Sequence, residues 1–182
     1  MVIVDFNGGP TIDCRIPNSE KTEKQLAETA KTVVHKFVSL QTDACLWSNS
    51  KMRSAEGMML RREGSDAECV IEAADVPATP DPGPGAYLNF LRKKHSNELR
   101  LIRSEVIVIQ GENWRREDVG LRLPPAPPST SGVMYQFANW TWRGANGVAM
   151  LTCFGPAPSL QAEMPQVEHV AASLKILPVT HP

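Results

Sequence analysis

The longest β-hairpin pattern of the 182-residue chain is the feature that most constrains its fold. Residues 99–109 alternate apolar with polar side chains at first and end in Val106-Ile107-Val108-Ile109, a β-branched run that favours a strand. Gln110-Gly111-Glu112-Asn113 supplies turn residues, and residues 114–123 return as the antiparallel partner. A pair this long needs further strands beside it to be stable, so the pattern predicts a sheet.

A second hairpin pattern follows directly. Residues 133–143 and 148–154 flank Gly144-Ala145-Asn146-Gly147, whose glycines and asparagine supply the positive φ angles that a tight hairpin turn requires. Shorter runs bounded by polar turns predict three more strands, at residues 44–48, 57–61 and 68–76. Together these segments predict a central antiparallel sheet of about six or seven strands.

Two main segments show the apolar period of an amphipathic helix. A capping-box pattern at residues 22–25 opens the first, and apolar residues spaced along one helical face predict a helix over residues 19–40. Residues 159–174 repeat such a face, with Pro165 either in the first turn or at a kink. A shorter helix with a basic end is predicted over residues 86–95. Two main helices packed on an antiparallel sheet give an α+β fold.

Length and composition indicate one domain, residues 1–182. The content of 42% hydrophobic and 21% charged residues is typical of a globular protein with a core. Two proline-rich loops, residues 77–85 and 124–132, are predicted as stiff connectors, and residues 178–182 as a frayed tail.

Charge and hydropathy bound the function and the location. Lys and Arg number 19 against 20 Asp and Glu, without a basic cluster large enough for nucleic acid. No apolar run is long enough for a membrane span, and the N-terminal run lacks the basic start of a signal peptide. We therefore expect a cytoplasmic protein with no nucleic-acid partner and no membrane span.

The four cysteines, Cys14, Cys45, Cys69 and Cys153, lie far apart in the sequence. No two of them have the close spacing of a structural zinc site, so no metal is expected. The favoured expectation is that all four are free and behave as small apolar residues. A disulfide between distant strands is the alternative.

The second half of the chain resembles the Mog1/PsbP-like superfamily, which includes the bacterial DcrB and DUF1795 proteins. The resemblance covers residues 86–177 and rests on Gly111 in its turn, the strand at residues 148–152, Pro156, and a final helix that runs into a short strand at residues 171–176. It implies an antiparallel sheet flanked by helices, without an enzymatic centre. It also implies protein binding, because members bind a photosystem component, a small GTPase or secreted effectors that need a chaperone.

The sequence contains few patterns that indicate catalysis or cofactor binding. The sequence has no phosphate-binding glycine loop, no dinucleotide fingerprint and no His-Glu-x-x-His pair, so no cofactor is expected. A Cys-His site would need one of His35, His95, His169 and His181, and only His35 lies beside a predicted core face. We therefore expect no enzyme, although a dispersed Cys/His or carboxylate site is the outside alternative.

The best functional lead is an aromatic and cationic group on two predicted hairpins. Trp140 and Trp142 lie two residues apart, so they share one face of a strand with Gln136, whereas Tyr135 and Phe137 take the other. If that face is covered by helices, the tryptophans are core residues. If it is open, the group is a protein interface with an apolar centre and a cationic rim. The candidate interface comprises Trp114, Arg115, Arg116, Trp140, Trp142 and Arg143.

We therefore expect a non-catalytic protein-binding or chaperone-like module with an unidentified protein partner. A small-molecule or lipid-binding pocket between the sheet and the helices is the alternative. The two differ in shape, because an interface needs a broad exposed face and a pocket needs a concave one. The sequence does not determine the oligomeric state.

Overall fold

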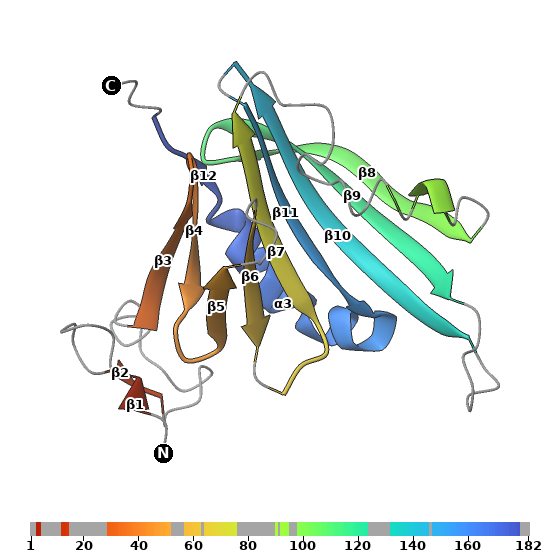
Figure 1. Cartoon of the computed structure of the whole chain (residues 1–182), viewed down its shortest axis with the longest axis horizontal. Helices are drawn as coiled ribbons and strands as arrows, with labels where there is room; N and C mark the ends of the chain where they lie inside the picture. Colours follow the sequence, from red (N-terminus) through yellow and green to blue (C-terminus); the bar gives the residue numbers. More distant parts are fainter. Residues whose placement is uncertain are drawn as a thin grey trace.

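A seven-stranded antiparallel sheet dominates the computed structural model (Figure 1), in the order β5-β6-β7-β11-β10-β9-β8. The structure describes residues 3–4, 12–14, 29–51, 57–62, 64–75, 90, 92–94, 98–123, 132–145 and 147–178. The strands of this sheet are β5 (Trp47–Lys51), β6 (Gly57–Arg62), β7 (Glu68–Asp75), β8 (Leu99–Ile109), β9 (Glu112–Leu123), β10 (Val133–Gly144) and β11 (Gly147–Pro156). The predicted α+β class with about seven antiparallel strands is confirmed.

Both predicted hairpins form. Strands β8 and β9 turn at Gln110 and Gly111, both of which have positive φ, and Ile109 pairs with Glu112. Strands β10 and β11 pair from Gly144 opposite Gly147 to Tyr135 opposite Pro156. The glycine-rich turn chemistry therefore sets the register of the four longest strands.

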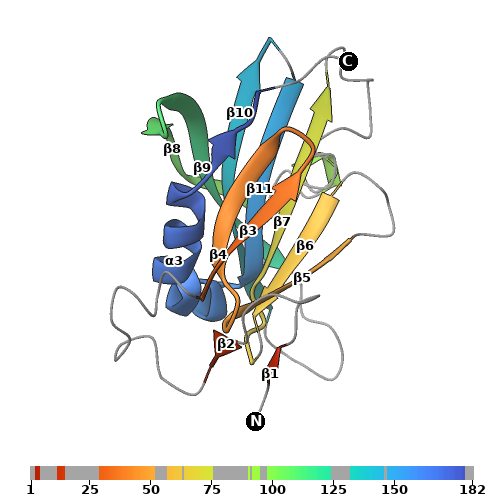
Figure 2. The same ribbon diagram turned by 90° about the vertical axis from the view of Figure 1, so that its left-hand side faces the viewer.

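A second layer covers one face of this sheet, which we call the inner face (Figure 2). It consists of helix α3 (Ala157–Ala172) and a three-stranded sheet of order β12-β4-β3. The three strands are β3 (Ala30–His35), β4 (Val38–Asp43) and β12 (Lys175–Ile176). Separately, β1 (Ile3–Val4) pairs with β2 (Ile12–Asp13).

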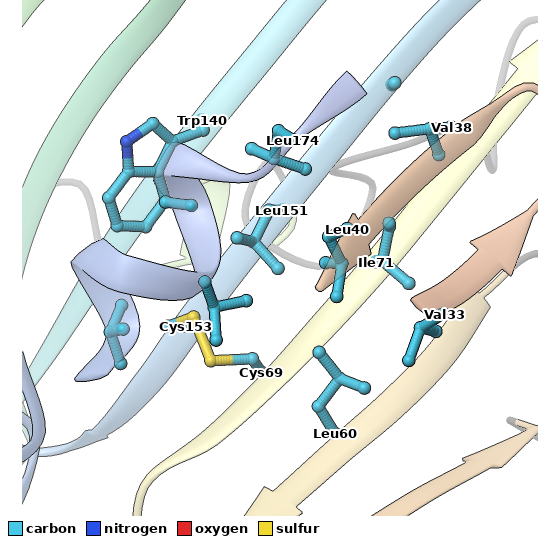
Figure 3. Packing of buried hydrophobic residues seen from close by; sticks show 14 of the residues in the cluster. Val33, Val38, Leu40, Leu60, Cys69, Ile71, Trp140, Leu151, Cys153 and Leu174 are labelled. Carbon is cyan, nitrogen blue, oxygen red and sulfur yellow. A yellow bond between two sulfur atoms is a disulfide. The ribbon is translucent and has the colours of Figure 1, made fainter. Parts of the chain in front are cut away.

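The main core lies between the two layers (Figure 3). Leu60, Ile71 and Leu151 of the large sheet, Leu40 of β4 and Leu174 after α3 are each at most 1% exposed. Helix α3 adds Leu160, Val167, Val170 and Ala171, which lie on one stripe of its surface. Burial of these side chains by two different elements is the main source of stability.

The predicted helix over residues 19–40 is wrong from Ala30 onward. Strands β3 and β4 form a hairpin there, with His35 opposite Val38 and Lys36 at a φ of 52° in the turn. The spacing of Val33, Phe37 and Leu40 fits a helical face, but β-branched residues prefer extended backbone, and pairing of β4 with β12 satisfies a further strand edge. Residues 19–28 lie outside the described part of the chain.

The expectation of four free cysteines is also wrong. Disulfides join Cys14 to Cys45 and Cys69 to Cys153. Cys69 and Cys153 are direct register partners on β7 and β11, and both side chains point into the main core, where their sulfur atoms meet (Figure 3). The two cysteines are 84 residues apart, so no local sequence pattern indicates that they pair. Only the strand order places them side by side.

The remaining predicted elements are mostly close to the observed ones. Helix α3 contains Pro165 in its interior rather than in its first turn, and the strand predicted at 44–48 begins only at Trp47. Of the helix predicted at 86–95, Phe90 and residues 92–94 are described and are helical. The proline-rich loop at 77–85 lies outside the described residues, as do all but Gly132 of the second loop and all but Pro178 of the tail.

The disulfides give a first prediction. Replacing both members of a pair with alanine should lower the free energy of unfolding more for Cys69 and Cys153 than for Cys14 and Cys45. The closed loops contain 84 and 31 residues, so loop entropy alone gives a difference of about 1 kcal/mol. Denaturant unfolding of the two double variants measures it. Thiol titration of the unfolded, unreduced wild-type protein is the control, and detection of free thiols would contradict the structure.

Candidate functional site

The six residues of the predicted interface divide between the interior and the surface. Trp114, Trp140 and Trp142 are 0%, 1% and 7% exposed, and Arg116 is equally buried. Arg115 and Arg143 are exposed. The tryptophans are therefore core residues, and they do not form an open aromatic patch.

The predicted split of strand β10 into two faces is confirmed. Trp140 and Trp142 belong to the main core on the inner face, and Gln136 on the same face receives a hydrogen bond from Gln161 of α3. Tyr135 and Phe137 pack instead in a second apolar cluster on the opposite, outer face. Because Trp140 and Trp142 lie on the inner face, the helix and the small sheet cover them.

Trp142 lies in a contact between both layers. Its ring centroid is 6.0 Å from that of Phe37 in the β3–β4 turn. Its Nε1 donates a hydrogen bond of 3.0 Å to Oε2 of Glu112. This polar partner allows an indole to be buried without leaving its donor unpaired.

Arg116 joins β9 to α3. Its Nε and Nη2 donate to the two carboxylate oxygens of Asp118 at 3.2 Å each, and its Nη1 donates to Glu168 of the helix at 2.8 Å. The guanidinium also lies over the Trp140 ring, 5.1 Å from its centroid. A further ion pair, Arg62 with Glu163, links the helix to β6.

The charge state of Arg116 follows from this environment. Burial alone lowers the pKa of the guanidinium, but the hydrogen bonds and charges of Asp118 and Glu168 outweigh it and raise the pKa above its ordinary value. Arg116 therefore stays cationic. The arrangement holds the helix on the sheet.

Arg115 and Arg143 lie on the outer face, opposite to the tryptophans. Arg115 pairs with Glu117 at 3.3 Å, and its register partner on β10 is Thr141, two residues from Arg143. Two of the three predicted rim arginines thus lie on the face opposite to the tryptophans, and the third, Arg116, is buried with them. The six residues therefore do not share one open face.

Exposed apolar side chains gather elsewhere, on β8 and at the start of β10. Among the described residues, most of the large apolar side chains that are exposed lie on these two strands: Leu101, Ile102, Val106, Val108, Val133 and Met134. Val106 and Val108 lie near the β8–β9 turn on the edge strand of the sheet. Leu101, Ile102, Val133 and Met134 lie at the opposite end of the hairpin, where the starts of β8 and β10 flank the end of β9.

Five of the residues at that end form a surface that we call the wing patch: Arg100, Ile102, Gly120, Arg122 and Met134. A Cβ atom on Gly120 would lie 3.4 Å from Cδ1 of Ile102 and 3.8 Å from Sδ of Met134. The missing side chain of Gly120 therefore lets the two apolar side chains converge over β9. Arg100 is the register partner of Gly120, and Arg122 that of Met134.

The wing patch combines apolar surface with free positive charge. Ile102 and Met134 are 60% and 45% exposed, and both arginines are exposed. Neither arginine side chain has an ion-pair partner among the described residues, in contrast to Arg103, which pairs with Glu105 at 2.5 Å. The patch has the composition predicted for the candidate interface, at a different place.

Sequence reasoning missed the wing patch, although two signals pointed to it. Ile102 interrupts the alternation of apolar residues that starts at Leu99, and a register shift lies there, between Leu101 and Arg103. Gly120 is an isolated glycine inside a strand, which often marks a bulge or a close approach of neighbouring groups. Neither signal shows by itself that the neighbouring apolar side chains are exposed.

The groups considered for catalysis or metal binding lie apart. All four cysteines are in disulfides, so no thiol is available beside His35. His169 is exposed on α3, and His95 and His181 lie outside the described residues. Where the structure describes the chain, no three His, Cys, Asp or Glu side chains are grouped to hold a metal ion. None of the described helices has both the length and the apolar character of a membrane span.

Comparison with solved structures identifies the fold. Cyanobacterial PsbP (CyanoP) of Synechocystis sp. PCC 6803 matches with a TM-score of 0.56 at 9% identity, over 81% of this chain and 92% of that one. A Bacteroides thetaiotaomicron protein matches with a TM-score of 0.53 at 13% identity, over 84% of this chain and 50% of that one. No protein-family model and no curated protein sequence matches. The chain has the Mog1/PsbP-like fold that the resemblance implies.

The buried charges give a second prediction. Arg116→Ala should destabilise the fold by about 3 kcal/mol or more, because it leaves the buried Asp118 carboxylate without its counter-charge. Arg115→Ala is the matched control, since its side chain is 62% exposed and its loss should cost at most about 0.5 kcal/mol. Denaturant unfolding of both variants measures the difference. Equal, small effects would show that Arg116 is not buried against α3.

Proposed function

We propose that this chain is a non-catalytic protein-binding module that docks its partner on the wing patch. The observation that carries the proposal is the convergence of exposed Ile102 and Met134 over Gly120, between two exposed arginines that form no ion pair with any described residue. Apolar surface with a charged rim is typical of the centre of a protein interface. The patch lies on three paired strands, so little conformational entropy is lost when a partner binds.

The chemistry of the patch indicates what the partner presents. The two exposed guanidinium groups favour carboxylates, which arginine binds through paired hydrogen bonds. Exposed Ile102 and Met134 favour apolar side chains between those carboxylates. The partner is therefore a protein segment with acidic and apolar residues, and an adaptor or chaperone role agrees with the protein binding that the Mog1/PsbP-like resemblance implies.

The other functional classes have less support. An enzyme with a Cys-His site would need a free thiol, and the disulfides occupy all four. A pocket between the two layers would need open volume where Leu151, Leu160 and Leu174 are fully buried. We therefore favour a surface over a pocket and binding over catalysis.

The disulfides also bear on location. Disulfides persist in oxidising compartments and are rare in the cytosol, where thiols are kept reduced. Two of them in one chain support an extracytoplasmic location rather than the cytoplasmic one expected from the sequence. A partner would then be met outside the cytosol.

A site-specific cross-link tests the binding proposal. A photoreactive benzoylphenylalanine replaces Met134 in cells that naturally produce the protein, and the adducts are identified by mass spectrometry. We expect one main protein adduct, attached at a segment rich in acidic and apolar residues. Adding Arg122→Glu to the same protein should reduce the adduct at least tenfold, because it reverses the charge beside the probe.

The matched control places the same photoreactive residue at Asn49, which is exposed on the opposite edge of the large sheet. It should give no corresponding adduct. Equal labelling from both positions, or adducts with lipid or small molecules alone, would overturn the proposal.

A further inference from the structure

The two edges of the seven-stranded sheet differ in a way that the wing patch does not explain. Strand β5 forms one edge with five residues, and its exposed side chains include Ser48, Asn49 and Ser50. Strand β8 forms the other edge with eleven residues. Long apolar edges tend to pair with another strand, whereas short polar ones resist pairing.

Strand β8 exposes its apolar residues on the outer face. Val106 and Val108 are each 70% exposed, the highest values among the large apolar side chains described, and Leu101 is 60% exposed. Their register partners on β9 are, in the same order, Arg115, Asn113 and Val119. Because β8 is the last strand of the sheet, no further strand lies on its other side in this sheet. The backbone groups along the free side of β8 also have no ladder partner within this sheet.

The sequence of β8 is complementary to itself when two copies run antiparallel. If Ser104 of one copy lies opposite Ser104 of the other, Arg103 faces Glu105 twice across a two-fold axis. Within one chain these two side chains already form an ion pair of 2.5 Å. Two copies would therefore bring together four charges of alternating sign, which favours this register over one that places Glu105 opposite Glu105.

The bulge places apolar residues of β8 opposite apolar residues of the second copy. The register with β9 shifts between Leu101 and Arg103, so Ile102 is the additional residue of β8. When that residue is skipped in both copies, Leu101 lies opposite Val106 and Leu99 opposite Val108. All four of these residues lie on the outer face, as their β9 partners show. On the outer face, apolar residues thus face apolar residues, whereas on the inner face Arg103 faces Glu105 and Arg100 faces Ile107.

We infer that a second copy of this chain pairs with β8, joining two seven-stranded sheets edge to edge in a symmetric dimer. Such an isologous contact closes on itself, so it gives a dimer rather than a fibre. The contact uses Leu101, Arg103, Ser104, Glu105, Val106 and Val108, whereas the wing patch centres on Ile102 and Met134. The inference does not depend on the proposed partner, and different substitutions test the two.

Sedimentation equilibrium of the full chain tests the dimer. Wild-type protein should sediment with twice the mass of the 20.0 kDa chain at micromolar concentration. The double variant Val106→Lys, Val108→Lys should raise the dimer dissociation constant at least a hundredfold. Its circular dichroism and melting temperature should stay close to those of wild type, because both side chains are largely exposed.

The control variant Val34→Lys changes a 50% exposed valine on a strand of the small sheet and should leave the dimer intact. Met134→Glu should also leave the mass unchanged, because this substitution disables only the wing patch. Wild-type protein that stays monomeric up to about 100 micromolar, on the order of the dissociation constant of a weak complex, would overturn the inference. A dimer that the two β8 substitutions do not affect would overturn it as well.

Cross-linking tests the register. Ser104→Cys places a thiol on the two-fold axis, opposite its own copy, at a separation that a disulfide can span. Oxidation should give a covalent dimer in high yield, whereas Ser48→Cys on β5 should give none. Cross-linking of Ser48→Cys as efficiently as Ser104→Cys would contradict edge pairing through β8.

Discussion

Burial of the inner face of the seven-stranded sheet is the constraint on which the rest of this structure depends. Two elements of the second layer, α3 and the β12-β4-β3 sheet, share the covering of that face. The largest fully buried side chains of the sheet, Trp114 and Trp140, point toward the second layer. Arg116 and the Cys69–Cys153 disulfide then fix the helix to the sheet and β7 to β11.

This packing also determines where a partner can bind. A face occupied by the tryptophans and by α3 is not available, so binding surfaces are left on the outer face and at the end of β8, β9 and β10 that lies outside the main core. There, Gly120 lets Ile102 and Met134 converge, and the bulge beside Arg103 keeps Leu101 on the same face of β8 as Val106 and Val108. The two proposed contacts share β8, and the wing patch also extends onto β9 and β10.

The sequence predicts the fold best where turn chemistry and side-chain pattern agree. Residues 99–109 have both a β-branched run and a glycine turn, and the strand is found at those bounds. Residues 30–40 lack such a turn glycine, and the apolar spacing there fits a helix as well as a hairpin, whereas the pairing of β4 with the distant β12 favours the hairpin. The disulfides and the exposed wing patch likewise depend on strand order, which local patterns do not contain. The faces of Trp140 and Phe137 followed from alternation, but which face is covered did not.

Quenching of tryptophan fluorescence by acrylamide tests the central claim most directly, because all four tryptophans of the chain are at most 7% exposed. The account predicts blue-shifted emission and a quenching constant several times lower in the native protein than in the protein unfolded by guanidinium. Native emission that is quenched as readily as in the unfolded chain would place tryptophans on the surface. The candidate interface would then be the face of β10 that carries Trp140 and Trp142, and the two-layer core would be incorrect.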